Sequence, residues 1–424
     1  MASKMLMGDI PELMENILKH LNNEIYSLYS CALVNRHWPT PLITLAFKLF
    51  LESGAILHKF GLYKSEFLKL EILHSLEQNV QFYSRLQHLS LDIISNFGIE
   101  NIAKLLRILA KNTTEISALR LVFHSKYASE LIHTLLPALI HFIKSQEQLR
   151  KFIINCRDGC PTEFYSIISA LGSQKDTLQE ATLEDCAFSE EFEALNNCKN
   201  LETLRILDCD AELLKILLNN NISTLEISHY QIDVPITVQI LEKIGILLQR
   251  LKIETRIVIR EESLLLEALK SFCPNIIYLY ITGIGLSTQL LELIGNLQKL
   301  QFLSLGYAHQ TPNEERKIRA MQFAKILPST LQYLDIALDL PNNLLLSFID
   351  ILLDHCNAPL KKLLISSISL TYKKNTKALI KYCARIRTLN YVGIVYYCSL
   401  DYDIRNELEK YVTLVPYEHI VVNC

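Results

Sequence analysis

Residues 198–209 read CKNLETLRILDC, and they contain the pattern that recurs along most of this chain. Leu201, Leu204 and Ile206 occupy the three apolar positions of an LxxLxL unit. Residues two apart in a strand point to the same face, so Leu204 and Ile206 predict a short strand that is buried on one side. Arg205 lies between them, and we therefore expect it on the other side, open to solvent.

The same apolar unit occurs twelve times from residue 86 onward. The copies are LQHLSL from Leu86, ISALRL from Ile116, LRKFII from Leu149, LQEATL from Leu178, LETLRI from Leu201, ISTLEI from Ile222, LQRLKI from Leu248, IIYLYI from Ile276, LQFLSL from Leu300, LQYLDI from Leu331, LKKLLI from Leu360 and IRTLNY from Ile386. Their starting points are 21 to 33 residues apart, in or near the period of about 20–29 residues that is typical of leucine-rich repeats. Each repeat of such an array packs only on its neighbours, so a chain of 424 residues can extend one core.

The stretches between these units have helical periodicity. Residues 99–110, IENIAKLLRILA, and 286–297, LSTQLLELIGNL, place apolar residues at three- and four-residue steps, which predicts one buried helical stripe. Parallel strands joined by such helices form one sheet backed by helices. Because helices pack about 8–10 Å apart and strands about 4.8 Å apart, the stack should bend toward its strands. The predicted fold class is therefore α/β: a leucine-rich-repeat solenoid of about twelve repeats over residues 86–424, with a curved parallel sheet.

Two further segments precede the repeats. Residues 49–85 have helical spacing, and we expect a helical connector that caps the solenoid. Residues 1–48 are predicted to form a small all-α module, with Asp9 as the N-cap and Pro11 in the first helical turn. Three short helices of this length bury little apolar surface by themselves, so this module is expected to dock on a partner or on the next domain.

Cysteine occupies a recurring place around the repeats. Cys198 precedes its LxxLxL unit by three residues, and Cys209 follows the last apolar position by three. Cys186 holds the later place in another repeat, while Cys273 and Cys383 hold the earlier one. A small, weakly polar thiol suits a buried turn beneath a solenoid. This pattern resembles the cysteine-containing class of leucine-rich repeats, which is found mainly in F-box proteins.

The N-terminal module itself resembles an F-box. That family shows a proline and an acidic residue, a pair of apolar residues with a leucine, a leucine-containing helix, and a Leu-Val pair shortly before a tryptophan. This chain has Pro11-Glu12, Ile17-Leu18, Leu21, Leu28, Leu33-Val34 and Trp38. The resemblance implies a substrate-recognition subunit of an SCF-type (Skp–cullin–F-box) ubiquitin ligase: the F-box binds a Skp-family adaptor, and through it a cullin–RING ligase, while the repeats hold a client protein. The adaptor-binding candidates are Pro11, Leu13, Ile17, Leu18, Leu21, Leu28, Leu33, Val34 and Trp38.

The residue between the last two apolar positions of each unit should face out on the concave side of the sheet. Down the array these residues are Ser90, Arg120, Ile153, Thr182, Arg205, Glu226, Lys252, Tyr280, Ser304, Asp335, Leu364 and Asn390. This mixture without one dominant charge suits a protein epitope better than a polyanion. The client-binding candidates are Arg120, Arg205, Glu226, Lys252, Tyr280, Ser304, Asp335 and Asn390. Tyr280, Tyr307 and Tyr391 mark the part to inspect first, because aromatic residues are enriched at interface hot spots.

Composition argues against several other classes. The net charge of −3, with no basic stripe, argues against a nucleic-acid partner. No run approaches the ~18–20 apolar residues of a membrane span, and the N-terminus lacks a signal-peptide core. Eleven scattered cysteines then indicate free thiols in a reducing compartment, cytoplasm or nucleus. Phosphate-binding and hydrolase motifs are lacking, and Cys156 and Cys160 have no second pair at zinc spacing, so neither a catalytic residue, a cofactor nor a metal is assigned.

Two other hypotheses remain open from the sequence. In one, the chain is a protein-binding scaffold or inhibitor unconnected to ubiquitin, and the N-terminal helices only cap the repeats. In the other, it is an enzyme with a site that no motif reveals, which predicts a deep pocket with converging titratable groups.

Overall fold

The computed structural model describes residues 56–62, 70–94, 98–124, 131–157, 162–219, 221–307, 313–338, 342–365, 373–394, 402–416 and 422. All the adaptor-binding candidates, Pro11 to Trp38, lie outside the described residues, as does Cys160. Contacts divide the chain into two compact units, Met1–Leu201 and Glu202–Cys424.

The first unit consists of short parallel strands that alternate with helices. Its strands are β1 (Lys59–Leu62), β2 (His88–Ile93), β3 (Ala118–Phe123), β4 (Lys151–Asn155) and β5 (Glu180–Glu184), each paired with the next. Its helices are α5 (Leu70–Gln78), α6 (Val80–Tyr83), α7 (Ile99–Asn112), α8 (Leu136–Ser145) and α9 (Ser166–Ala170), with a π-helical turn η3 (Leu131–Leu135) and 3₁₀ helices η4 (Thr162–Tyr165), η5 (Leu171–Gln174) and η6 (Glu190–Asn197).

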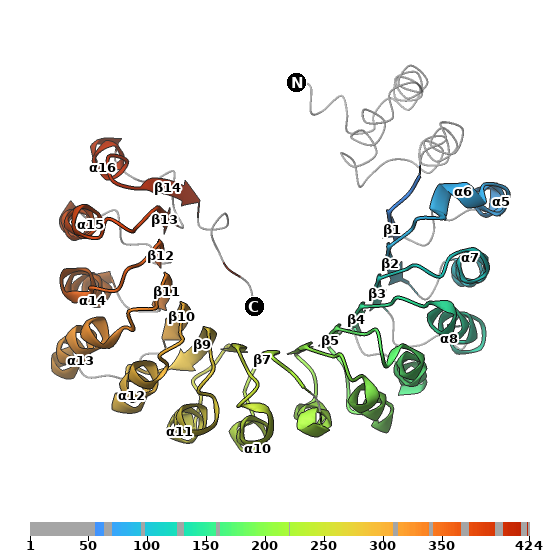
Figure 1. Cartoon of the computed structure of the whole chain (residues 1–424), viewed down its shortest axis with the longest axis horizontal. Coiled ribbons are helices and arrows are strands. Elements are labelled where there is room, and N and C mark those ends of the chain that lie inside the picture. The colour runs from blue at the N-terminus through green and yellow to red at the C-terminus, as the bar shows by residue number, and fades with distance from the viewer. Residues whose placement is uncertain are drawn as a thin grey trace. The chain divides into compact units, whose positions relative to one another are not determined.

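The second unit repeats this arrangement. Its strands are β6 (Thr203–Leu207), β7 (Thr224–His229), β8 (Arg250–Thr255), β9 (Tyr278–Ile284), β10 (Phe302–Tyr307), β11 (Tyr333–Leu338), β12 (Lys362–Ile365), β13 (Tyr391–Ile394) and β14 (Thr413–Pro416), parallel and paired in chain order. Its helices are η7 (Ala211–Asn219), α10 (Val234–Ile244), α11 (Glu262–Phe272), α12 (Thr288–Asn296), α13 (Asn313–Ile326), α14 (Asn342–His355), α15 (Lys373–Arg385) and α16 (Tyr402–Leu408). Within this unit the helices lie on one side of the strand layer (Figure 1). The predicted leucine-rich-repeat fold is confirmed.

The core lies between the strands and the helices. On β8, Leu251 and Ile253 are fully buried, while Arg250 and Lys252 on the opposite face are half-buried. Across the layer, α11 buries Leu265 and neighbouring apolar residues. This alternation is what the LxxLxL pattern predicts, because the last two apolar positions share the face that packs on the helices.

Side chains of the sequence fix where several helices begin. The Asp233 carboxylate accepts a hydrogen bond of 3.0 Å from the Ile236 amide at the start of α10. The Ser287 hydroxyl accepts one of 3.2 Å from the Leu290 amide at the start of α12. Each bond satisfies a backbone N–H that the helix leaves unpaired. Caps of this kind end the loop after one strand and start the helix that covers the next part of the core.

The cysteines of the repeats are structural. Seven cysteines in the described part of the chain are free and buried. Burial raises the pKa of Cys198 to about 11 and that of Cys273 and Cys383 to about 12. Thiols with such a pKa are poor nucleophiles near neutral pH. These residues are therefore buried packing groups: Cys198 and Cys273 end helices as expected for a turn, whereas Cys383 lies inside α15 and not in a turn.

Three details differ from the sequence analysis. Strand β1 lies inside the segment read as a helical connector, and β14 adds a strand after the last expected repeat. The twelfth unit is shifted by three residues, because Val392 pairs with Leu363 and takes the buried position. Asn390 was predicted to face out at the centre of that strand; the residue is exposed, but its placement at the centre is wrong. It precedes β13, where its carbonyl accepts the Thr413 amide at 2.9 Å, and Gly393 takes the central position instead.

Candidate protein-binding surface

The strand face is defined as the side of each strand layer that turns away from the helices. In the second unit the register sets Arg205 beside Glu226, Glu226 beside Lys252, and Lys252 beside Tyr280. It continues with Ser304 and then Asp335. Six of the eight client-binding candidates thus form one row across β6–β11, and this row is called the central row below. Arg120 occupies the equivalent position on β3 of the first unit.

Glu226 ties the first part of the central row together. Its carboxylate lies 3.2 Å from Nε of Arg205 and 2.8 Å from Nζ of Lys252. Lys252 also lies 3.0 Å from the Glu254 carboxylate. These four side chains carry equal numbers of positive and negative charges, so the strands meet without net repulsion. An ion pair at this depth needs several partners to offset its desolvation, and here Glu226 and Lys252 each have two.

The neighbours of Lys252 keep it charged. Burial by itself would lower the pKa of this ammonium group, but hydrogen bonds and charges from Glu226 and Glu254 outweigh burial and raise the pKa above its usual value. The ammonium also lies 5.1 Å from the centre of the Tyr280 ring, a distance at which a cation is attracted to an aromatic face. Lys252 is therefore a fixed positive charge and not a proton donor that titrates near neutral pH.

Tyr280 is held by the same group of residues. Its hydroxyl lies 3.4 Å from the Glu254 carboxylate. Burial, followed by the negative charge of Glu254, raises the pKa of Tyr280 above the usual tyrosine value. The phenol remains protonated and can donate a hydrogen bond. A half-buried aromatic ring with an oriented hydroxyl suits protein recognition.

Ser304 and Asp335 close the central row, and both are more buried than the repeat pattern predicts. The Ser304 hydroxyl donates to the Asp335 carboxylate at 2.9 Å. Both residues were expected to be open to solvent, yet their exposed fractions are only 5% and 3%. Phe302 and Tyr333 precede them by two residues on the same strands, and such residues share a face. Large aromatic side chains therefore stand beside these small polar ones, which brace the sheet and offer little surface to a partner.

An aromatic column, consisting of Tyr278, Phe302 and Tyr333, runs beside the central row. The ring centres are 6.3 Å apart between Tyr278 and Phe302 and 5.9 Å apart between Phe302 and Tyr333. The Arg250 guanidinium stacks on Tyr278, 4.6 Å from the ring centre. The LxxLxL pattern does not mark this column, because the outward position that it defines is the residue between the last two apolar positions. Aromatic residues directly before the second apolar position in three successive repeats were the available signal.

The strand face of the first unit is also of mixed charge. Nη1 of Arg120 lies 3.1 Å from Oδ1 of Asp92 and 3.3 Å from the Ser90 hydroxyl. Nε2 of His124 lies 3.6 Å from the other carboxylate oxygen of Asp92. The side chain of Arg120 is 38% exposed, so it is available to a partner on this face.

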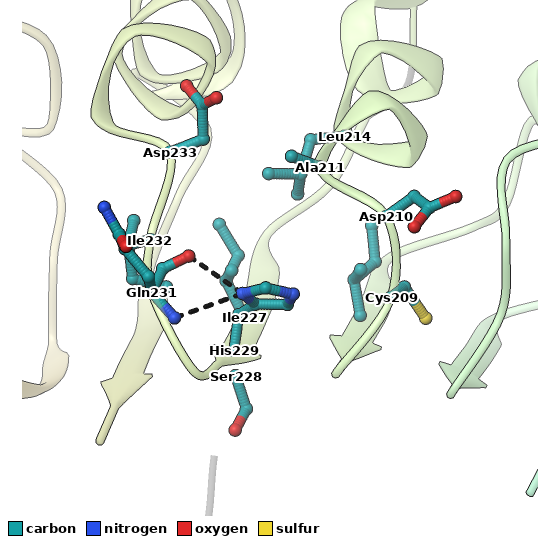
Figure 2. A pocket seen from close by; sticks show the side chains of 11 residues that line it. Cys209, Asp210, Ala211, Leu214, Ile227, Ser228, His229, Gln231, Ile232 and Asp233 are labelled. Carbon is teal, nitrogen blue, oxygen red and sulfur yellow. Dashed lines mark hydrogen bonds between the residues drawn. The ribbon is translucent and has the colours of Figure 1, made fainter. Parts of the chain in front are cut away.

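A small cavity lies at the loops that follow β6 and β7 (Figure 2). Its volume is about 20 Å³, room for about one water molecule. His229 hydrogen-bonds to the backbone of Gln231, and Asp233 caps α10. These groups are used by the loops themselves, and the cavity is too small for a substrate. Among the described residues, no group of three or more His, Cys, Asp or Glu side chains could hold a metal ion. No described helix is both long and apolar enough to cross a membrane.

No protein-family model and no curated protein matches this sequence. Among solved structures, the chain is similar to a chain in the complex of Rad7 and Elc1 from yeast, with a TM-score of 0.42, 13% identity, and coverage of 94% of this chain and 86% of that one. It is also similar to the leucine-rich repeat-containing protein LegL7 from Legionella pneumophila, with a TM-score of 0.42, 12% identity, and coverage of 71% and 98%.

Proposed function

We propose that this protein is a non-catalytic substrate-recognition subunit of an SCF-type ubiquitin ligase. In this proposal the strand face binds a client protein. The F-box-like residues between Pro11 and Trp38 bind a Skp-family adaptor, which connects the client to a cullin–RING ligase. Two features support the proposal: the F-box-like pattern in residues 8–38, and the leucine-rich repeats that follow it.

The central row is the observation that carries the client-binding half of the proposal. It offers charges of both signs from Arg205, Glu226 and Lys252, and an aromatic ring from Tyr280, on one continuous sheet. A nucleic acid would require a clear excess of positive charge. Mixed charges around an aromatic residue are instead typical of protein interfaces, where charge complementarity sets specificity and aromatic residues contribute affinity.

A protein-binding scaffold without a ligase is the second candidate, because the described strands between Lys59 and Pro416 already form a surface of mixed charge that could bind a protein. The two functions differ in one property: only the ligase subunit needs the apolar pair Ile17 and Leu18 to contact an adaptor.

Co-purification with a Skp-family adaptor tests the adaptor-binding half. The intact chain should elute with the adaptor as a one-to-one complex, and Ile17→Asp with Leu18→Asp should abolish the complex. Leu264→Asp is the control, because this leucine is 47% exposed on α11 and its replacement places a negative charge elsewhere on the chain. If a folded wild-type chain forms no complex, the ligase function is refuted and the scaffold function takes its place.

A further inference from the structure

Val422, close to the C-terminus, is seated on the aromatic column. The Tyr278 hydroxyl donates a hydrogen bond of 3.0 Å to the Val422 carbonyl, although the two residues are 144 positions apart in the sequence. The Val422 amide donates to the Tyr333 hydroxyl at 3.4 Å. Two tyrosines from β9 and β11 therefore hold the main chain of a single residue on either side.

The side chain of Val422 packs on an apolar patch of the strand face. It joins Tyr333 and Leu364, with Phe302 and Val415 beside them. Leu364 is fully buried, and Tyr278 and Tyr333 are each 2% exposed. By contrast, the side chains of Arg205 and Lys252 on the same face are each 21% exposed. This apolar patch is thus covered, whereas the central row next to it stays partly open.

The contacts of Val422 indicate which kind of molecule this apolar patch can bind. Hydrogen bonds to a carbonyl and an amide recognise any peptide main chain, whatever its sequence. The apolar patch adds a preference for a branched aliphatic side chain. Arg250, stacked on Tyr278 at the edge, adds a positive charge beside the patch.

We infer that the aromatic column and its apolar patch are a binding site for a linear peptide segment with a branched aliphatic residue, and that Val422 of this chain is the resident ligand. A partner that presents such a segment has to displace Val422. Val422 thus competes with incoming peptides for this part of the strand face. The inference stands independently of any link to a ubiquitin ligase.

Binding of the terminal peptide in trans tests the inference. A chain ending at Pro416 would be titrated into a fluorescein-labelled peptide of residues 417–424, with Cys424→Ser to prevent oxidation, and followed by fluorescence anisotropy. Saturable binding is expected for the shortened chain, and binding at least tenfold weaker for the intact chain, whose own Val422 occupies the site. Tyr278→Phe with Tyr333→Phe in the shortened chain should weaken binding about tenfold or more, because both hydroxyl contacts are lost. Tyr402→Phe, on an exposed side chain of α16, should leave binding unchanged.

Three results would overturn the inference: no binding to a folded shortened chain, equal binding to both chains, or full affinity after loss of both hydroxyls. Carboxypeptidase digestion of the full-length chain provides a test that needs no truncation. Release of residues as far as Val422 should be several-fold faster in the Tyr278→Phe and Tyr333→Phe double variant than in the wild type. Equal release rates would contradict the seating of Val422.

Discussion

Replacement of Glu226 by glutamine should destabilise the second unit by about 2–3 kcal/mol. The carboxylate contacts Arg205 at 3.2 Å and Lys252 at 2.8 Å, and only 12% of its side chain is exposed. Hydrogen bonds to charged groups contribute about 1.5–3 kcal/mol each, and partial exposure of both cations reduces that value. The glutamine side chain keeps one oxygen that accepts a hydrogen bond from one of the two cations. Its NH₂ group, which cannot accept, faces the other cation. The remaining bridge from Lys252 to Glu254 limits the loss.

Urea unfolding followed by circular dichroism measures this loss as a lower midpoint at unchanged slope. Glu212→Gln is the matched control, since its ion pair with Lys215 is about half exposed and such pairs contribute about 0–1 kcal/mol. If the repeats unfold in several steps, hydrogen exchange of the β7 and β8 amides reports the same difference locally. A loss no larger than that of the control would refute the idea that Glu226 holds the central row together.

Two further predictions concern single positions in the repeats. Gly283→Ala should destabilise the chain by about 2–3 kcal/mol, because φ at this glycine is +73° and an added Cβ would lie 2.4 Å from Cγ2 of Thr255. Gly172→Ala, with no atom within 4 Å of the added Cβ, should change the free energy of unfolding little. Thermal melts of both variants measure the difference, and an equal loss of stability in both would contradict the prediction. Cys273 and Cys383, whose pKa burial raises to about 12, should resist iodoacetamide at pH 8 in the folded chain and react after denaturation. Peptide-resolved mass spectrometry checks this, and rapid alkylation of the native chain would show that the thiols are accessible.

The repeats were predictable because their information is local. Leu251 and Ile253 are two apart, and on strands β2 to β11 such a pair is buried on the helix side of the strand. The missed strands carry weaker signals. On β1, Phe60 stands where most repeats have leucine or isoleucine, and on β14 Pro416 occupies the last apolar position. Proline is tolerated in a strand that lacks a further partner, and β14 is the last strand among the described residues.

Only part of the candidate surface could be predicted from the sequence. Regular register brought Arg205, Glu226 and Lys252 side by side, so the composition of the central row followed from the repeat pattern. The burial of Asp335 and the seating of Val422 on Tyr278 did not, because both depend on contacts between residues far apart in the sequence. Periodicity reports which face a residue takes, but not what covers that face.

Site-specific photo-crosslinking tests most directly whether the strand face is the client-binding surface. A photoreactive phenylalanine analogue would replace Tyr280 in the central row, and in a second variant Leu264, which is exposed on the helix side. After irradiation in cells, we expect discrete cross-linked partner proteins from position 280, lost on Arg205→Glu with Lys252→Glu, and none above background from position 264. Cross-links from the helix side alone, with the strand face silent in a folded protein, would contradict the account.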